Sequence, residues 1–183
     1  KDFIPQKANT LRSANWRTPV KGKCFVVIAS DSPGQGTVHE ERFKAIKLGI
    51  ADGSYKPVRN VDGNGPNWFE EMVEHLRTCE LAVVDLTAER PNCIWELGIL
   101  NAWDVPVVLI HPKNSGLPSD IFTHRVSVFY EGQSATELAR LRIDIRDKIE
   151  AVMSYDDRGK FLPRSSKLIL VKEQNRVFSD FEI

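Results

Sequence analysis

The chain has 183 residues, 42% of them hydrophobic and 27% charged, a composition typical of a soluble globular domain with appended segments. Lysine plus arginine and aspartate plus glutamate each number 25, so no net charge favours a nucleic acid or a membrane surface as a partner. No apolar run approaches the roughly 20 residues that span a bilayer, and no signal peptide is visible, which indicates a cytoplasmic protein.

The expected elements alternate along most of the chain. Residues 1–22 show little periodicity and are interpreted as an N-terminal arm, and the initial Lys1, in place of methionine, indicates a fragment of a longer chain. Residues 23–154 form the predicted domain, and residues 155–183 are interpreted as a C-terminal tail or docking segment. The predicted strands are CFVVIAS (24–30), YKPVRNV (55–61), LAVVDLT (81–87), PVVLIHP (106–112) and RVSVFYE (125–131). The predicted helices cover residues 39–53, 67–80, 92–104 and about 136–153.

This order of elements predicts the fold class. The first, third and fourth strands are nearly continuous in apolar residues, as parallel strands are when helices cover both faces of a sheet. Repeated strand–helix–strand units connect by right-handed crossovers. We therefore expect an α/β fold, a flavodoxin-like three-layer sandwich with a five-stranded, mostly parallel sheet that fits the strand order 2-1-3-4-5. In such sheets ligands bind outside the carboxyl ends of the strands, beside strand one.

The cysteines and histidines give no sign of a metal or redox centre. Cys24, Cys79 and Cys93 show no CxxC spacing, and each lies in or beside an apolar run, so buried free thiols in a reducing compartment are expected. No histidine or other positive group is placed by sequence to activate Cys93, which favours a packed thiol over a nucleophile. The four histidines have no metal-ligand spacing, and we predict neither a metal nor a cofactor.

The loops after the first two strands hold candidate ligand contacts. ASDSPGQGTVHEE (29–41) is neither a P-loop nor a dinucleotide fingerprint. Its residues Ser30, Asp31 and Gly34 either contact a phosphate at the N-terminus of the next helix or form a flexible turn. Arg59 and Asp62 end the second strand, where Asp-Gly and Asn-Gly pairs are strong turn formers. We favour a place in the cleft for both.

The stretch DLTAERPNCIWELG (85–98) is the most informative. Asp85 ends a buried strand, and Thr87 either caps the following helix or contacts a ligand. Asn92 either caps that helix or reaches a ligand hydroxyl. Trp95 either packs in the core or borders a base-binding pocket beside Glu96. Glu96 lies one turn into the helix among apolar neighbours. A partly desolvated carboxylate there could approach the anomeric carbon of a ribose. The alternative is a capping aspartate with a half-exposed glutamate.

The segments CFVVIAS (24–30), VRNVD (58–62) and LAVVDLTAERPNCIWELGILNAWDVPVVLI (81–110) resemble the family of nucleoside 2-deoxyribosyltransferase-like and TIR-like proteins. Members typically carry Asp-Leu-Thr, then Asn-Pro-Asn-Val, two mostly aromatic residues and Glu-Leu-Gly. The resemblance covers about residues 23 to 131. It implies that Glu96 cleaves N-glycosidic bonds and that Asp85 and Asn92 belong to the same site. This chain departs from the family pattern at Arg90, Cys93, Leu100 and Asn101.

Two functions are therefore expected from different classes. The first is cleavage of the N-glycosidic bond of a nucleoside, nucleotide or NAD, by a hydrolase or a deoxyribosyltransferase. Glu96 would attack or shield C1′, Asp85 would hold a ribose hydroxyl or assist at the base, and NAD would be a substrate rather than a cofactor. The alternative is a non-catalytic, nucleotide-binding TIR-like module for signalling or assembly. For either function we expect a small-molecule ligand and either a homo-oligomer or a larger multidomain chain.

Overall fold

The computed structural model describes residues 17–29, 38–59, 67–88, 90–112, 126–130, 132 and 134–154. Strands and helices alternate through these ranges, and each predicted element occurs. Each strand is shorter than its predicted range. In chain order the elements are β1 (Lys23–Val27), α2 (Val38–Asp52), β2 (Lys56–Val58), α3 (Trp68–Thr78), β3 (Leu81–Asp85), α4 (Pro91–Ala102), β4 (Val107–His111), β5 (Val126–Phe129) and α6 (Ala135–Ser154).

The five strands form one sheet in the order β2-β1-β3-β4-β5, and every neighbouring pair is parallel. The predicted flavodoxin-like order is confirmed. Since β1 lies between β2 and β3, the chain reverses its direction of travel across the sheet at the β1–β3 boundary. Ligands of open α/β sheets bind outside the carboxyl ends of the strands at such a boundary. That edge of the sheet is therefore the place to look for a site.

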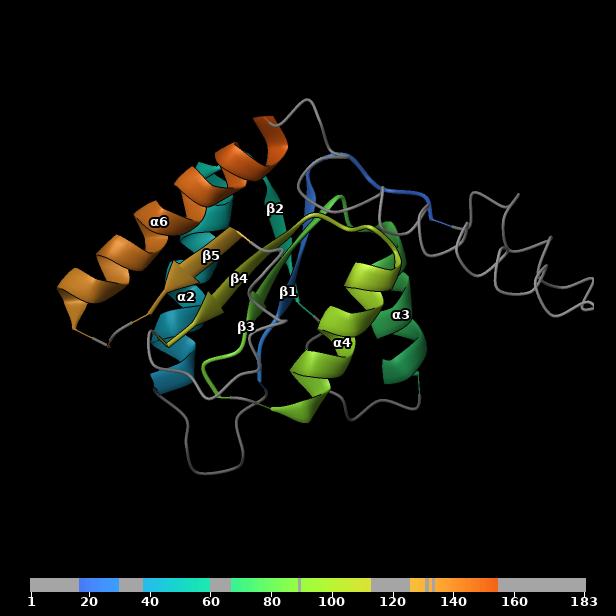
Figure 1. Ribbon diagram of the computed structural model, residues 1–183, viewed down its shortest axis with the longest axis horizontal. Coiled ribbons are helices and arrows are strands. Elements are labelled where there is room, and N and C mark those ends of the chain that lie inside the picture. Colours follow the sequence, from blue (N-terminus) through green and yellow to red (C-terminus); the bar gives the residue numbers. More distant parts are fainter. Residues whose placement is uncertain are drawn as a thin grey trace, which may run out of the picture.

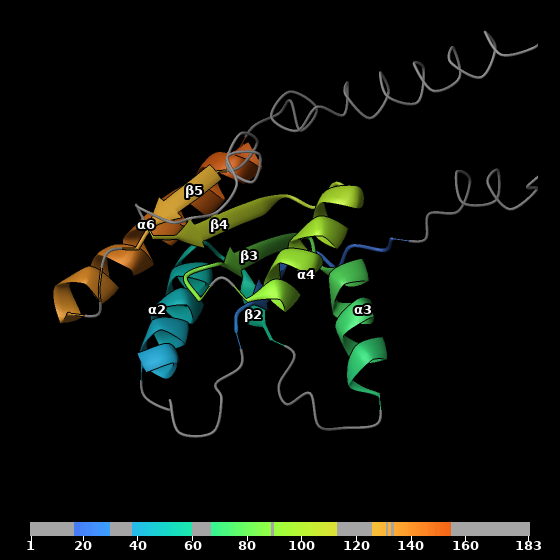
Figure 2. The same cartoon turned by 60° about the horizontal axis from the view of Figure 1, so that its bottom comes forward.

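Helices cover both faces of the sheet. Helices α2 and α6 lie together on one face, and α3 and α4 lie on the other (Figures 1 and 2). Side chains alternate between the two layers along each strand. Val83 and Val108 join the core beneath α2 and α6, whereas Val84 and Leu109 join the core beneath α3 and α4. The predicted three-layer sandwich is confirmed.

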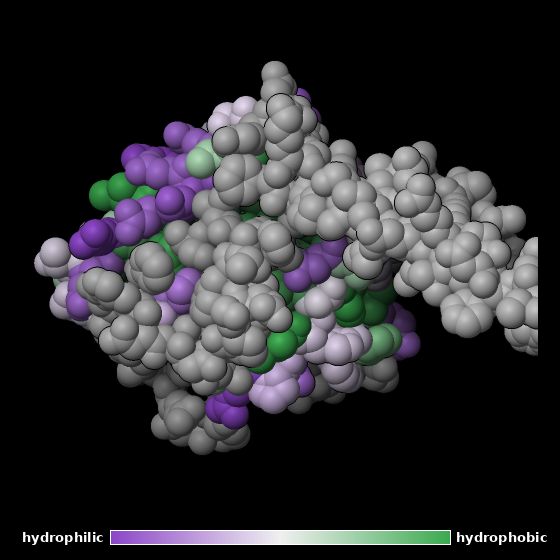
Figure 3. Space-filling model, in the orientation of Figure 1, coloured by the Kyte–Doolittle hydropathy of each residue, from purple (hydrophilic) through white to green (hydrophobic). Residues whose placement is uncertain are grey.

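The α2–α6 contact is unusually close at one glycine. A Cβ atom on Gly49 would lie 2.6 Å from the carbonyl oxygen of Arg142, well inside van der Waals contact. The absence of a side chain lets the two helices approach at this point. Elsewhere the outer surface of α6 is mostly hydrophilic with scattered hydrophobic residues (Figure 3). Ile143 of this helix is 48% exposed. Such an amphipathic pattern is typical of a helix that covers one face of a sheet.

Other expectations concern the start of the chain, the cysteines and membrane insertion. The described end of the predicted arm packs on the fold, since Arg17 donates hydrogen bonds to the carbonyl oxygens of Cys79 (2.6 Å) and Trp103 (3.1 Å).

Cys24, Cys79 and Cys93 are buried free thiols, as predicted. Within the described ranges, none of the helices has the length and apolar character needed to cross a membrane.

Candidate functional site

Asp85 stands at the carboxyl edge of the sheet, and its charge is fully partnered. The Nε of Arg42, on α2, donates to its Oδ2 at 2.7 Å, and the two side chains are only 5% and 1% exposed. The backbone N–H of Thr87 donates to the other oxygen, Oδ1, at 2.9 Å. A buried carboxylate requires such partners because leaving it unpaired is very costly. Both oxygens of Asp85 are thus engaged within the chain.

Sequence reasoning missed Arg42. Helix α2 carries an apolar stripe that includes Ile46 and Ile50, both fully buried in the structure. Arg42 precedes Ile46 by four residues, and residues at this spacing lie on the same helix face. The spacing was therefore a signal that Arg42 points toward the sheet. Its partner, 43 residues away along the chain, was not readable from any local pattern.

Tyr130 completes this buried polar group. It follows β5 and is 8% exposed, and the guanidinium carbon of Arg42 lies 5.3 Å from the centre of its ring. Burial raises the pKa of the Tyr130 hydroxyl, although the nearby Arg42 charge opposes the rise. Arg42 therefore sits between a carboxylate and an aromatic ring, in the layer between the sheet and α2.

Glu96 has a different environment. It lies on α4 beside the buried stripe of Cys93, Leu97 and Leu100, and it is half-buried. Burial raises its pKa from an ordinary 4.5 to about 7. Among the residues that the structure describes, no ion pair involves Glu96. The result is a partly desolvated carboxylate that forms no ion pair with any cation in the described part of the chain.

The charges of both carboxylates affect Cys93, which lies on α4. The pKa of its thiol is raised to about 12, mainly by burial and also by the negative charges of Glu96 and Asp85, while Arg90 opposes the rise. Both acidic groups therefore act on the same sulfur atom. The two carboxylates belong to different layers, because Asp85 ends β3 of the sheet and pairs with Arg42 of α2, whereas Glu96 belongs to α4. The thiol stays protonated at neutral pH, as expected of a packed cysteine.

Three other predicted residues on the described part of this edge have specific surroundings. The guanidinium carbon of Arg59 lies 4.7 Å above the ring of Phe43, so its cation packs on α2. The hydroxyl oxygen of Thr87 is buried without a hydrogen-bond partner among the described residues. The Trp95 ring is 49% exposed and lies 6.0 Å from the ring of Phe69 on α3.

The capping roles expected for Thr87 and Asn92 are wrong. Helix α4 begins at Pro91, with Arg90 at the cap position and no side-chain capping bond. A proline fits the first helical position because it lacks the N–H that would otherwise be unsatisfied. Thr87 consequently lies before the helix, and Asn92 lies exposed within its first turn. The exposed Asn92 amide remains available to a ligand.

Ser30, Asp31, Gly34 and Asp62 lie outside the described residues, so their predicted contacts with a ligand stay predictions. The same holds for a phosphate site in the loop after β1. In the described ranges, no group of three or more histidine, cysteine, aspartate or glutamate side chains is arranged to hold a metal ion.

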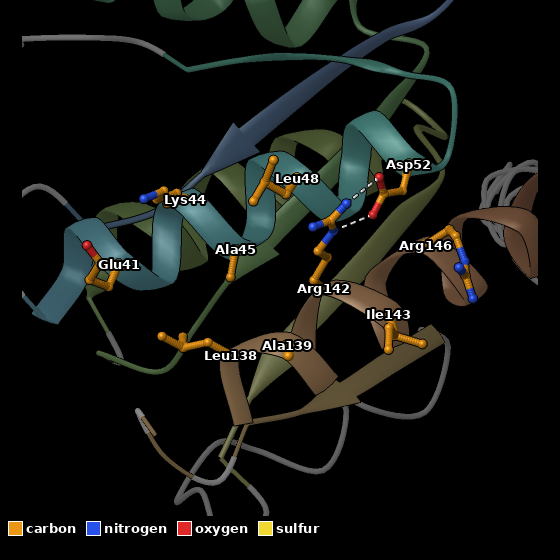
Figure 4. A pocket seen from close by; sticks show the side chains of 10 residues that line it. All are labelled: Glu41, Lys44, Ala45, Leu48, Asp52, Leu138, Ala139, Arg142, Ile143 and Arg146. Atoms are coloured by element: carbon orange, nitrogen blue, oxygen red, sulfur yellow. Dashed lines mark hydrogen bonds and ion pairs between the residues drawn. The ribbon is translucent and has the colours of Figure 1, made fainter. Parts of the chain in front are cut away.

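A groove elsewhere on the molecule contains none of the predicted site residues. It runs between α2 and α6, has a volume of about 430 Å³, and is lined in its centre by Ala45, Leu48 and Leu138 (Figure 4). At one end Arg142 and Asp52 form an ion pair across the two helices. The groove lies on the α2–α6 layer, whereas Glu96 belongs to the opposite layer, so we do not assign the chemistry to it.

The sequence matches no family model and no curated protein. Among solved structures, it is similar to the CMP N-glycosidase BcmB of Clostridium botulinum, with 14% identity, a TM-score of 0.46, and coverage of 64% of this chain and 95% of that chain. It is also similar to a 2-deoxyribosyltransferase of Bacillus psychrosaccharolyticus, with 16% identity, a TM-score of 0.45, and coverage of 63% and 90% respectively. A diflavin flavoprotein of Nostoc sp. gives 14% identity, a TM-score of 0.44, and coverage of 75% and 94%. At such low identity and TM-score, these similarities do not extend to function.

Proposed function

We propose that this protein cleaves the N-glycosidic bond of a nucleoside, nucleotide or NAD, with Glu96 at the reacting carbon. The observation that carries the proposal is the environment of Glu96, a half-buried carboxylate without an ion-pair partner among the described residues. It stands near the carboxyl edge of a parallel sheet, where ligands of this architecture bind. The PNCIWELG sequence around it supports the same role.

The chemistry follows from the charge of the carboxylate. When the base departs with the bonding electron pair, C1′ of the ribose becomes electron-deficient and resembles an oxocarbenium ion. The Glu96 carboxylate either stabilises that cation through its negative charge or attacks C1′ with one of its oxygen atoms and forms a covalent bond. Water then takes the sugar in a hydrolase, whereas a second base takes it in a transferase. Because no cation among the described residues pairs with Glu96, the ionised carboxylate is free of such competition when it acts on the transition state.

The remaining predicted residues would shape the pocket around this carbon. Trp95 and Asn92 are exposed on α4 close to Glu96 along the helix, and we assign them contacts with the base and a hydroxyl. Thr87 offers a buried hydroxyl oxygen without a partner among the described residues. The loop residues Ser30, Asp31, Gly34 and Asp62, together with Arg59, stay candidates for the phosphate or ribose.

The proposal is tested by measuring base release. The protein is incubated with NAD, with ribonucleotides and with deoxynucleosides, with and without a second free base, and products are separated by chromatography. Free base without an acceptor indicates a hydrolase, and a new nucleoside with an acceptor indicates a transferase. Binding of a nucleotide without any turnover would instead favour the non-catalytic signalling module.

Glu96→Gln identifies the catalytic group. This change keeps the shape of the side chain but removes its charge, so we expect turnover to fall at least about 100-fold. Substrate binding should change much less, because the charge matters most in the transition state. The matched control is Glu150→Gln, which removes an exposed carboxylate on α6 and should leave turnover unchanged. Equal base release by the Glu96→Gln variant and the unmodified protein would contradict the proposed role.

A further inference from the structure

We propose that the buried Arg42–Asp85 ion pair is a positioning device that holds the β3–α4 connection and so places Glu96, without either residue touching the substrate. This inference rests on the proposed function and changes the part assigned to Asp85. The resemblance implies that Asp85 belongs to the reacting site. Its hydrogen bonds point to a different use of the same carboxylate.

The first step is the link between two elements that are distant in sequence. Arg42 lies near the start of α2, and Asp85 is the last residue of β3, so their 2.7 Å contact joins the beginning of the helix to the end of the strand. The Tyr130 ring, 5.3 Å from the guanidinium carbon, covers another side of Arg42. The position of the Asp85 carboxylate is therefore determined by three elements at once.

The second step leads from Asp85 to the connection that follows it. Its Oδ1 accepts the backbone N–H of Thr87, two residues on, which fixes the first turn after the strand. The N–H of Leu86 also donates to the carbonyl oxygen of Ile110 at 2.8 Å. The connection ends at Arg90, and α4 begins with Pro91. Because the connection is this short, its conformation determines where the first turns of α4, and hence Glu96, stand.

The third step concerns charge. Asp85 ends β3 and Glu96 lies in α4, the next element along the chain, and the charges of both raise the pKa of the Cys93 thiol. Arg42 neutralises Asp85 locally, and burial is the cause of the raised pKa of Glu96. Of the two carboxylates, Glu96 is the one without an ion-pair partner among the described residues. Removing one member of the ion pair would place a new charge near Glu96 and change its titration.

The free energy of folding alone does not account for a buried ion pair at this position. Replacing a buried ion pair by apolar side chains of similar volume is often neutral or stabilising, whereas removing one partner costs about 3–5 kcal/mol. An apolar pair would fill the same space but would offer Thr87 no acceptor. Such a replacement is therefore expected to disturb the conformation of the β3–α4 connection rather than the stability of the protein.

The test compares two double variants. Arg42→Met/Asp85→Leu keeps the volume and removes every polar contact, whereas Arg42→Gln/Asp85→Asn keeps a neutral acceptor for the Thr87 N–H. We expect the apolar variant to fold with a melting temperature close to that of the unmodified protein and to lose at least about 10-fold in kcat with little change in KM. The neutral polar variant should recover most of kcat. Arg77→Met/Glu74→Leu replaces an exposed ion pair on α3 and is the matched control, expected to be fully active.

Two results would overturn the inference. A folded apolar variant with unchanged kcat would show that the pair is only structural. A folded neutral polar variant as inactive as Glu96→Gln would show that the charge of Asp85 is itself needed at the substrate. If the apolar variant does not fold, the neutral polar variant alone decides between these roles.

A readout without turnover separates this inference from the proposed function. Amide hydrogen exchange at Thr87 and the titration of the Glu96 carboxyl group, both followed by NMR, should change in the apolar variant and remain near normal in the neutral polar one. If neither responds, the positioning role is wrong whatever the activity. If both respond but the unmodified protein releases no base from any substrate, only the proposed function fails.

Discussion

Two acidic side chains near the same sheet edge differ in what surrounds them. Asp85 is fully buried and accepts hydrogen bonds from the Arg42 guanidinium and the Thr87 N–H. Glu96 is half-buried and has no ion-pair partner among the described residues. Pairs of carboxylates with different environments commonly divide their roles, because burial and nearby charge decide which one is ionised and available. Here the environments favour a positioning role for Asp85 and a reacting role for Glu96.

The raised pKa of Glu96 predicts the pH dependence of turnover. A nucleophile or electrostatic stabiliser must be ionised, and with a pKa of about 7 the ionised fraction falls as pH drops below neutrality. We expect kcat/KM to rise with pH and level off above about 7, so that the value at pH 6 is about 10-fold below the plateau. An ordinary glutamate would already be ionised throughout this range.

The measurement is a pH–rate profile between pH 5.5 and 8.5 with the best substrate found, in buffers of constant ionic strength. A folded-state check at each pH, by circular dichroism, separates loss of ionisation from loss of structure. A flat profile across this range in a protein whose turnover depends on Glu96 would contradict the assignment of its pKa.

At the scale of single elements, the α2–α6 layer depends on one close contact. Gly49→Ala would place a methyl group 2.6 Å from the Arg142 carbonyl oxygen, and a backbone atom cannot move away easily. We expect this change to lower the free energy of unfolding by about 1–3 kcal/mol, the usual cost of overpacking. Chemical denaturation followed by circular dichroism measures it.

Gly98→Ala is the matched control within α4. A Cβ atom there would meet no other atom within 4 Å, and Gly98 lies exposed in the helix. Because alanine has a higher helix propensity than glycine, this change should stabilise the protein by up to about 1 kcal/mol. A similar gain in stability in both variants would mean that helix propensity, rather than the contact with Arg142, governs Gly49.

At the scale of the whole molecule, the buried cysteines can show whether the two cores, one on each side of the sheet, unfold together. Cys24 belongs to the core beneath α2 and α6, whereas Cys79 and Cys93 belong to the core beneath α3 and α4. Burial raises the pKa of Cys79 to about 11 and that of Cys93 to about 12, so the reactive thiolate form is scarce at neutral pH. We expect all three thiols to react with an aromatic disulfide reagent only as fast as the protein unfolds.

The rate is followed by absorbance in the native protein and in urea, where the three thiols should react promptly. If the two layers unfold together, the native protein shows one slow phase for all three cysteines. Separate mass mapping of Cys24 and Cys93 identifies the layer that opens if two phases appear. Rapid labelling of Cys93 alone in the folded protein would mean that the neighbourhood of Glu96 opens independently.

Most of the architecture was predictable because it depends on local patterns. Continuous apolar runs such as residues 81–84 occur in parallel strands that are covered on both faces, and the segments between them carry helical spacing. Helix ends were less predictable. The start of α4 shifted to Pro91 because proline suits the first helical turn, which left Asn92 inside the helix.

By itself, the sequence determined the alternation of strands and helices, the parallel sheet that follows from it, and the placement of Asp85 and Glu96 near its carboxyl edge. Only the tertiary structure decided what surrounds each acidic group there. Arg42 meets Asp85 across 43 residues of chain, Arg59 packs on Phe43, and burial raises the pKa of Glu96. The physical reason is that apolar periodicity is written into neighbouring residues, whereas the burial and pairing of a charge depend on elements that meet only when the chain is folded.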